Sequence, residues 1–291
     1  MKVKKSLVLW LVFFSLIATH TVLFTQLQAN RDTGKQSLHI RALPLPPSFY
    51  TVLTGEFQGL AADFLYLDIA ATLGGREKPN LSTTEWDGLE KMFAVAVTLD
   101  PHFTPTFRAV QAYLPWLAKR PEAANRLLTI VSESRNWDWQ PPFFIGFNHY
   151  FFLNDNKAAS IALMDAAKRE QAPTALATFG ARLAAESGAE DAGIELLTRL
   201  LQTKESEFEK KPLQDRIEAL RGVKQLKELV ARYKAEQGVN PPNLHDLIFL
   251  GYVKDLPVNP YYDSYFYQDG VVRFDPFPQK NKAGRLLPKN K

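Results

Sequence analysis

Cysteine is absent from this sequence of 291 residues. Its absence excludes disulfide bonds, thiolate metal sites and cysteine catalysis. The packing of apolar side chains must therefore stabilise the fold without covalent cross-links. Apolar residues make up 46% of the chain, which is enough for a sizeable core.

Several motifs of common catalytic sites are also missing. The chain has no glycine-rich phosphate loop, no His-Glu-x-x-His and no Gly-x-Ser-x-Gly. Its five histidines are isolated from one another in the sequence, so no local spacing supports a metal cluster or a Ser-His-Asp set, although either can assemble in space. We therefore assign no catalytic residue, no cofactor and no metal ligand. Paired acids such as Glu186 and Glu190, or Glu190 and Asp191, are the remaining basis for an enzyme.

A basic body is lacking too, despite a pI near 9.0. Lys2, Lys4 and Lys5 supply 3 of the formal net charge of +4, and the tail 279–291 supplies 5, so the residues between them carry −4. Nucleic-acid binding needs Lys and Arg clustered on one face. We therefore expect no nucleic-acid partner.

What the chain does have is a repeated spacing of small and apolar residues. Leu89, Ala123, Ala159 and Ala192 follow one another at intervals of 34, 36 and 33 residues. A period of this length is typical of helical hairpin repeats, in which no single unit buries its own apolar face. Function is then expected on a surface that several units build together.

The second helix of the first unit carries the most specific residues. Leu89, Phe93 and Ala96 fall on one helix face, and Leu99-Asp100-Pro101 ends the helix. This segment resembles the tetratricopeptide repeat (TPR). The same frame recurs at Phe107, Ala123 and Leu127 and at Gly180, Ala192 and Leu196, while the unit at 141–169 fits with a shift of one or two residues.

The TPR resemblance implies a mainly α fold, a right-handed superhelix of antiparallel helical hairpins. It also implies that first-helix residues line a concave groove that binds peptides. In this frame those residues are Arg108, Phe144, Asn148 and Phe151, which we predict to bind a protein partner. An ordinary α-helical domain with accidental spacing is the alternative.

The N-terminal segment predicts a membrane anchor. Residues 7–24 contain no charge, and a helix of that length spans about 27 Å, close to the thickness of the bilayer hydrocarbon. The preceding lysines should remain in the cytoplasm, which places the bulk of the chain in the periplasm, held by a single pass through the inner membrane. A cleaved signal peptide is the alternative, with a weak cleavage site at Leu27-Gln-Ala29.

A long amphipathic helix is expected after a proline-rich spacer. Between Phe49 and Leu73, the apolar residues are spaced by three or four positions, and Gly74-Gly75 ends the run. The members of this apolar stripe are Leu53, Phe57, Leu60, Phe64, Leu67 and Ala71. The acids Glu56, Asp63 and Asp68 are expected on a solvated face or facing a partner. Further on, Pro115 is expected to bend the helix at 103–119.

The C-terminal part predicts a long helix followed by a small module. Residues 206–237 carry a second apolar stripe at three- and four-residue spacing, and Gly238 ends it. A short helix follows near Leu244. The Asp269-Gly270 pair then predicts the turn of a β-hairpin.

This module resembles the C-terminal part of the major pseudopilins of type II secretion and related type IV pilin-like proteins. The matching residues are Pro242, Leu244, Leu247, Gly251-Tyr252, Leu256-Pro257, Asn259-Pro260-Tyr261 and Tyr265-x-Tyr267. The family's calcium loop is absent, so no calcium site is implied. A convergent cap that seals the last helix is the alternative. We predict that Tyr261, Tyr262 and Tyr265 form a surface for a partner.

The chain is expected to divide into a transmembrane anchor or signal (1–26), a proline-rich spacer (27–47), a TPR-like helical repeat array (48–203), a long helix (204–237), a small α+β pseudopilin-like cap (238–276) and a basic disordered tail (277–291). The resulting hypothesis is a non-catalytic, membrane-anchored extracytoplasmic scaffold for protein partners, accessory to type IV pilus or type II secretion assembly. The alternative is an envelope enzyme on an α-superhelical frame that acts on cell-wall glycan.

Overall fold

The computed structural model describes residues 13, 15–22, 24–25, 46–74 and 81–276. The described part is mainly helical and contains one small two-stranded sheet, as the helical periodicity predicts. It separates into two compact units, residues 1–99 and 100–291, which are described in turn. Much of the expected anchor at 7–24 lies outside the described residues. None of the helices formed by the described residues has the length and hydropathy needed to cross a bilayer.

The first unit is built on α4 (Thr83–Leu99), against which α2 (Pro47–Thr54) and α3 (Gln58–Gly74) pack. A capping box begins α4: the Ser82 amide donates to Glu85 Oε2 at 2.7 Å, and the Glu85 amide donates to Ser82 Oγ at 3.3 Å. The expected continuous helix at 49–73 is interrupted by the 3-10 turn η2 (Gly55–Phe57). Gly55 has φ +49°, a conformation that glycine adopts without strain.

Helix α3 has apolar side chains on two opposite faces. Ala62, Ile69 and Leu73 are buried in the unit. The apolar stripe predicted from the sequence lies on the other face, where Phe64 and Leu67 are exposed. An amphipathic helix normally buries such a stripe. Here the face with the smaller residues is the one that packs.

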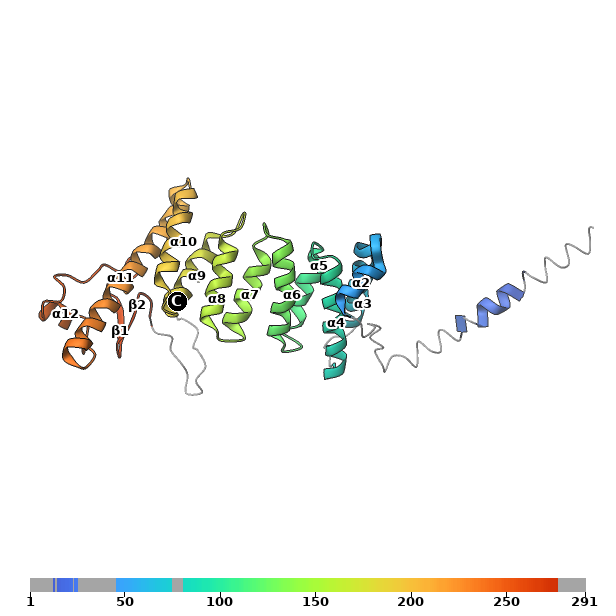
Figure 1. Ribbon diagram of the computed structural model, residues 1–291, viewed down its shortest axis with the longest axis horizontal. Coiled ribbons are helices and arrows are strands. Elements are labelled where there is room, and N and C mark those ends of the chain that lie inside the picture. The colour runs from blue at the N-terminus through green and yellow to red at the C-terminus, as the bar shows by residue number, and fades with distance from the viewer. Residues whose placement is uncertain (1–12, 14, 23, 26–45, 75–80, 277–291) are drawn as a thin grey trace, which may run out of the picture. The chain divides into compact units, whose positions relative to one another are not determined.

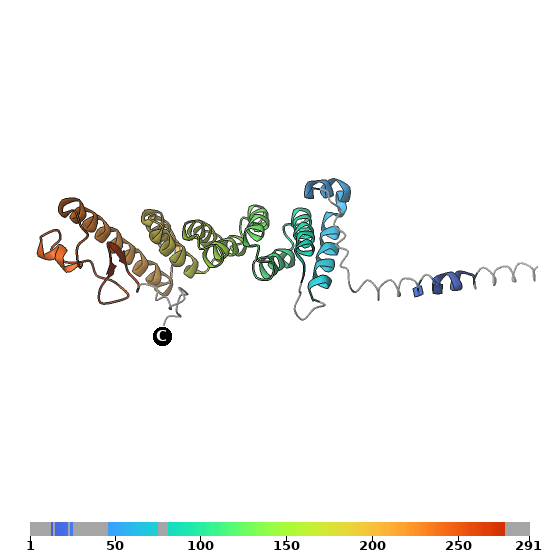
Figure 2. The same ribbon diagram turned by 90° about the horizontal axis from the view of Figure 1, so that it is seen from below.

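The second unit consists of helices that follow one another in space as they do in the chain (Figure 1). They are α5 (Thr104–Tyr113), α6 (Pro121–Ser134), α7 (Gln140–Phe151), α8 (Asn156–Ala167), α9 (Thr174–Glu186), α10 (Glu190–Thr203) and α11 (Glu207–Gln237). Figure 2, turned by 90°, shows these helices alternating between two rows. The odd-numbered helices begin at intervals of 36, 34 and 33 residues, which matches the predicted period.

The structure corrects the predicted register of the last pair by one residue. Ala192 is exposed, and the neighbouring Gly193 is buried at the crossing of α10 with α9. A Cβ added to Gly193 would lie 3.1 Å from the Ala181 backbone. The sequence pattern favoured alanine at this position because it is the usual small residue. The tighter crossing selects glycine instead.

We therefore expect Gly193→Leu to lower the free energy of unfolding by about 1–3 kcal/mol, because its side chain would force α9 and α10 apart. Ala192→Leu is the matched control, since it adds the same bulk one residue away on the exposed face, and it should change stability by less than about 0.5 kcal/mol. Urea unfolding of the two variants measures the difference. A larger loss of stability in Ala192→Leu than in Gly193→Leu would restore the register predicted from the sequence.

Pro115 ends α5 instead of bending it. The helix stops at Tyr113, and a tight turn follows in which the Leu117 amide donates to the Tyr113 carbonyl at 3.0 Å. Proline lacks the amide that the next helical hydrogen bond requires. The turn leaves Trp116 and Leu117 partly exposed after the end of α5.

The long helix α11 buries the predicted apolar stripe. Its buried members are Leu213, Ile217, Leu220, Val223, Leu226 and Val230. Gly238 ends the helix at φ +74°, as expected. The C-terminal module (residues 238–276) follows, with α12 (His245–Phe249) and an antiparallel hairpin of β1 (Phe266–Gln268) and β2 (Val271–Arg273). Tyr267 pairs with Val272 in its register. The predicted Asp269-Gly270 turn joins the two strands, with both residues at positive φ.

The module and the helices α8 to α11 share one hydrophobic core. Leu247, Val272 and Phe274 of the module are buried in the same cluster as Leu197 and Leu220. The module therefore covers the apolar side of α11 and is an integral part of the second unit.

Candidate functional site

A group of exposed and half-buried side chains, most of them aromatic, marks the surface at the end of α5 and α7. We define this aromatic surface as Trp116, Leu117, Phe147, Phe151 and Phe152. Phe147 and Phe151 lie one helical turn apart on α7, with ring centroids 5.3 Å apart and nearly parallel planes. Trp116 contacts Phe151 at 5.4 Å and Phe152 at 4.8 Å. Trp116 is 41% exposed and Phe151 is 52% exposed.

Exposed aromatic rings that support one another are suited to binding. Each ring has few rotatable bonds, so ordering it against a partner costs little conformational entropy, and protein interfaces are enriched in Trp and Phe. The five residues of the aromatic surface come from two segments about 30 residues apart, which the packing of consecutive helices brings together. Phe151 belongs to the binding set predicted from the sequence, whereas Trp116 does not. The signal for it was a tryptophan directly after a helix-ending proline.

The other three predicted groove residues lie in different environments. Arg108 is exposed and donates to Gln140 Oε1 at 3.0 Å, which links α5 to the start of α7. Phe144 is half-buried, 6.5 Å from the Phe107 ring and 5.4 Å from the Phe143 ring. Asn148 has no exposed surface. Its side chain is therefore not available to a partner, and we remove it from the binding set.

Asn148 instead connects three helices through a buried amide network. Its Oδ1 accepts from Gln111 Nε2 at 2.9 Å, and its Nδ2 donates to Gln111 Oε1 at 2.9 Å and to Asn125 Oδ1 at 2.8 Å. These residues belong to α5, α6 and α7. Buried amides need partners, so the network fixes how these helices pack beneath the aromatic surface.

A second polar network ties together the loops at one end of the helices. Arg169 donates through Nη1 to the carbonyl oxygens of Ser132 (3.2 Å), Arg135 (2.9 Å) and Asp138 (2.9 Å). Its Nη2 donates to Ser132 Oγ at 2.7 Å and to Asp165 Oδ2 at 2.8 Å. Arg169 therefore connects the end of α8 to the loop between α6 and α7, which makes it a structural residue.

The tyrosines predicted to meet a partner are only partly available. Tyr261 and Tyr262 are exposed, but Tyr265 is 6% exposed and belongs to the core. The Tyr265 hydroxyl donates towards the Val258 carbonyl at 3.1 Å and lies 3.3 Å from the Ala219 carbonyl, so it fixes the module against α11. Burial raises the pKa of the Tyr265 phenol to about 12. We therefore restrict the predicted tyrosine surface to Tyr261 and Tyr262.

Tyr261 also forms part of an arginine stack. The Arg216 guanidinium lies 5.1 Å from the Tyr261 ring centroid and 4.5 Å from that of Phe274. Burial lowers the pKa of Arg216, and the nearby Tyr261 opposes this shift. The stack holds α11 to the module and leaves the outer edge of Tyr261 exposed.

Charged side chains fix the module to α9 as well. Glu186 accepts from Arg273 Nη2 at 2.7 Å, and Asp275 accepts from Arg273 Nη2 at 2.9 Å and from Arg182 Nη1 at 3.3 Å. Glu190 pairs with Lys227, and Asp191 pairs with Lys224 at 2.7 Å. The acids considered for catalysis thus form ion pairs between elements of the second unit.

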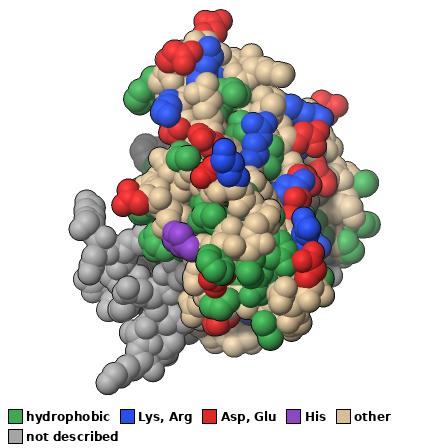
Figure 3. Space-filling view, turned by 90° about the vertical axis from the view of Figure 1, so that its left-hand side faces the viewer, with side chains coloured by type: hydrophobic (Ala, Val, Ile, Leu, Met, Phe, Trp, Pro, Cys, Tyr) green, Lys and Arg blue, Asp and Glu red, His purple; other side chains and the backbone are tan. Residues whose placement is uncertain are grey.

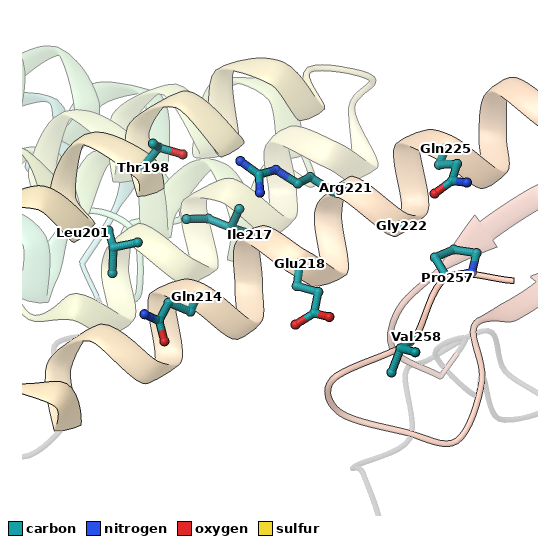
Figure 4. Close-up of a pocket in the computed structure, with 10 residues that line it drawn as sticks. All are labelled: Thr198, Leu201, Gln214, Ile217, Glu218, Arg221, Gly222, Gln225, Pro257 and Val258. Carbon is teal, nitrogen blue, oxygen red and sulfur yellow. The ribbon is translucent and has the colours of Figure 1, made fainter.

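A groove of about 460 Å³ lies where α10 and α11 meet the loop at Pro257 and Val258 (Figure 4). Arg221 and Glu218 line it and extend in opposite directions from α11. The groove is open, and its lining mixes polar with apolar side chains. Among the described residues, no group of three or more His, Cys, Asp or Glu is placed to hold a metal ion.

The outer end of the second unit presents further apolar side chains. Phe249, Leu250 and Val239 are exposed around α12. Figure 3 looks at this end and shows hydrophobic side chains gathered below rows of mixed charge. Charges of both signs surround the apolar atoms on this face.

Comparisons with known protein families, with curated proteins and with solved structures found no match to this chain.

Proposed function

We propose that this chain is a non-catalytic, membrane-anchored scaffold that binds protein partners outside the cytoplasm through a TPR-like array. The observation that carries the proposal is the aromatic surface on the second unit. Its rings support one another, and Trp116 and Phe151 are exposed while Phe147 and Phe152 are half-buried, an arrangement that favours a protein ligand over solvent. The 33–36 residue period of the helices supports a right-handed superhelix of hairpins.

The partner class follows from the C-terminal module. Its residues resemble the C-terminal part of type II secretion pseudopilins, and Tyr261 and Tyr262 remain exposed on it. We propose accordingly that the scaffold is an accessory to a pilus or secretion assembly in the inner membrane. The anchor at 7–24 would hold the array at the periplasmic side, and the spacer at 27–47 would set it off the bilayer.

Site-specific photo-cross-linking tests the proposal. A photoreactive phenylalanine at position 151 is expected to capture a defined protein in intact cells, because that ring lies in the aromatic surface. The matched control is position 161 on α8, where Ile161 is 63% exposed but lies outside the aromatic surface. Trp116→Ser should reduce capture at position 151 by about tenfold, the usual effect of removing an interface anchor.

Several outcomes would count against the proposal. Equal capture from positions 151 and 161 would mean that the aromatic surface is not a specific site. A mature chain beginning at Asn30 would remove the membrane anchor and leave a soluble periplasmic protein. Release of fragments from purified cell-wall glycan by the chain would favour the enzyme alternative.

A further inference from the structure

The first unit carries an apolar stripe that no described residue covers. Leu60, Phe64 and Leu67 are exposed along one face of α3, and further exposed apolar side chains precede them in α2 and η2: Phe49, Val52, Leu53 and Phe57. Phe57 is 70% exposed, Phe64 is 62% exposed and Leu67 is 59% exposed. Single exposed apolar residues are ordinary on protein surfaces, but several large ones on one helix face mark an interaction site.

The geometry of α3 shows that the stripe is a separate face. At 100° per residue, Leu60, Phe64 and Leu67 fall within a sector of about 60°. Ala62, Ile69 and Leu73, which are buried in the unit, point about 170° away from that sector. The packing of α3 against α4 therefore does not use the stripe, and none of the described residues of the first unit covers it.

Acidic side chains border the stripe on both sides. Asp63 and Asp68 lie about 70° to either side of its centre, and Glu56 precedes it in η2. All three carboxylates are exposed, and none forms an ion pair with another described residue. Residues 42–75 contain no Lys or Arg, so this segment carries a net charge of −3.

This charge decides between the possible occupants. Helices that lie in a membrane interface normally carry Lys and Arg beside their apolar face, and acids there are repelled by anionic lipid headgroups. A second copy would bring the same acids against this face, and like charges across an interface are unfavourable. A helix with basic residues beside its own apolar face would cover the stripe with that face and pair its basic residues with the acids at the borders.

We infer that this stripe is a docking site for an amphipathic helix of a protein partner whose apolar face is bordered by Lys or Arg. From Phe57 to Leu67 the stripe runs about 15 Å, which corresponds to about three turns of a docked helix. The partner's leucine-like side chains would fill the spaces between Leu60, Phe64 and Leu67. Its basic side chains would face Asp63 and Asp68. This site lies in the first unit, so the inference does not depend on the aromatic surface.

Peptide binding to the full chain in a lipid nanodisc tests the inference. The probe is a fluorescent synthetic helix as long as α3, with leucines on one face and lysines along both borders. A second probe replaces every lysine with glutamate. We expect the lysine peptide to bind at least about tenfold more tightly than the glutamate peptide, as measured by fluorescence anisotropy.

Three variants identify the surface that binds. The double variant Leu60→Ser, Phe64→Ser should lower the affinity for the lysine peptide by about tenfold or more, because the two substitutions remove the centre of the stripe. The double variant Asp63→Asn, Asp68→Asn should also lower the affinity for the lysine peptide, and it should abolish the preference for the lysine peptide over the glutamate peptide. Ile161→Ser is the control for an exposed apolar residue elsewhere and should leave binding unchanged. All these positions are exposed, so each variant should keep the helical circular dichroism of the parent.

A single thiol distinguishes the other occupants. Because the chain has no cysteine, Phe64→Cys can be labelled or oxidised at one position only. Quenching of an environment-sensitive label there by brominated lipid would show that the stripe lies in the membrane, and efficient disulfide formation between two chains would show that it joins copies. Lipid quenching or disulfide formation of this kind would overturn the inference. Equal binding of the lysine and glutamate peptides would also overturn it, as would unchanged peptide binding by the variant that carries both Leu60→Ser and Phe64→Ser.

Discussion

Replacing Gly222 with leucine is expected to detach the C-terminal module from α11 and to lower the free energy of unfolding by about 2–5 kcal/mol. A Cβ at this position would lie 1.9 Å from the Tyr265 hydroxyl oxygen and 2.4 Å from its Cζ. Even alanine therefore displaces Tyr265. Because the Tyr265 hydroxyl donates to the Ala219 carbonyl of α11 at 3.3 Å, that displacement also breaks a link between α11 and the module.

Hydrogen exchange measures where the protein loosens. In the Gly222→Leu variant, amides of β1, β2 and α12 should exchange faster, while those of α6 and α7 should keep their protection. Gln225→Leu is the control, since Gln225 lies one turn further along α11 and is exposed. If the amides of β1, β2 and α12 exchanged at the same rates in Gly222→Leu and in Gln225→Leu, Tyr265 would not hold the module.

Alkaline titration gives an independent readout of the same contact. The pKa of Tyr265 in the folded chain is about 12, above its ordinary value of 10.0. The stability that the neutral phenol contributes is therefore complete below pH 10 and is lost as the pH rises toward 12. Tyr265→Phe cannot ionise and should remove this part of the alkaline loss. An unchanged pH profile would contradict the burial of the phenol.

Replacing Arg169 with methionine is expected to lower the free energy of unfolding by about 2–5 kcal/mol. Methionine keeps most of the aliphatic stem, but it removes the donors to three backbone carbonyls and to Ser132 and Asp165. The Arg169 side chain is 11% exposed, so water replaces these donors poorly. Thermal unfolding measures the loss.

Two further variants separate charge from geometry. Arg169→Lys keeps the positive charge but lacks the planar fork, so its stability should fall between those of the parent and Arg169→Met. Arg199 pairs with Glu195 on an exposed surface, and Arg199→Met should have no measurable effect. A loss in Arg199→Met equal to that in Arg169→Met would mean that the loop network does not stabilise the fold.

The local parts of the fold could be predicted from the sequence. The helical period, the stop at Gly238 and the Asp269-Gly270 turn depend on the preferences of a few neighbouring residues, and each is found where it was expected. The buried stripe of α11 was predictable because that helix has one apolar face. Such features are determined within one or two turns of chain.

The candidate sites were less predictable because exposure depends on distant residues. Asn148 and Phe151 are three residues apart on α7, but Gln111 and Asn125 bury the first and the second is exposed. Tyr265 was placed on a surface because tyrosine is common there, yet the missing side chain of Gly222 makes room for its ring in the core. The spacing of residues along the sequence predicts neither the contacts of Asn148 with Gln111 and Asn125 nor the packing of Tyr265 against Gly222.

The sequence by itself determined the helical class, the repeat interval, the C-terminal ends of α3, α4 and α11 and the absence of cysteine chemistry, because propensity, periodicity and composition act locally. The tertiary structure decided which of two apolar faces of α3 is buried and which small residue lies in the α9 and α10 crossing. It also decided which aromatic rings remain exposed. Periodicity defines the faces of a helix, but the shape of the neighbouring elements selects the face that packs.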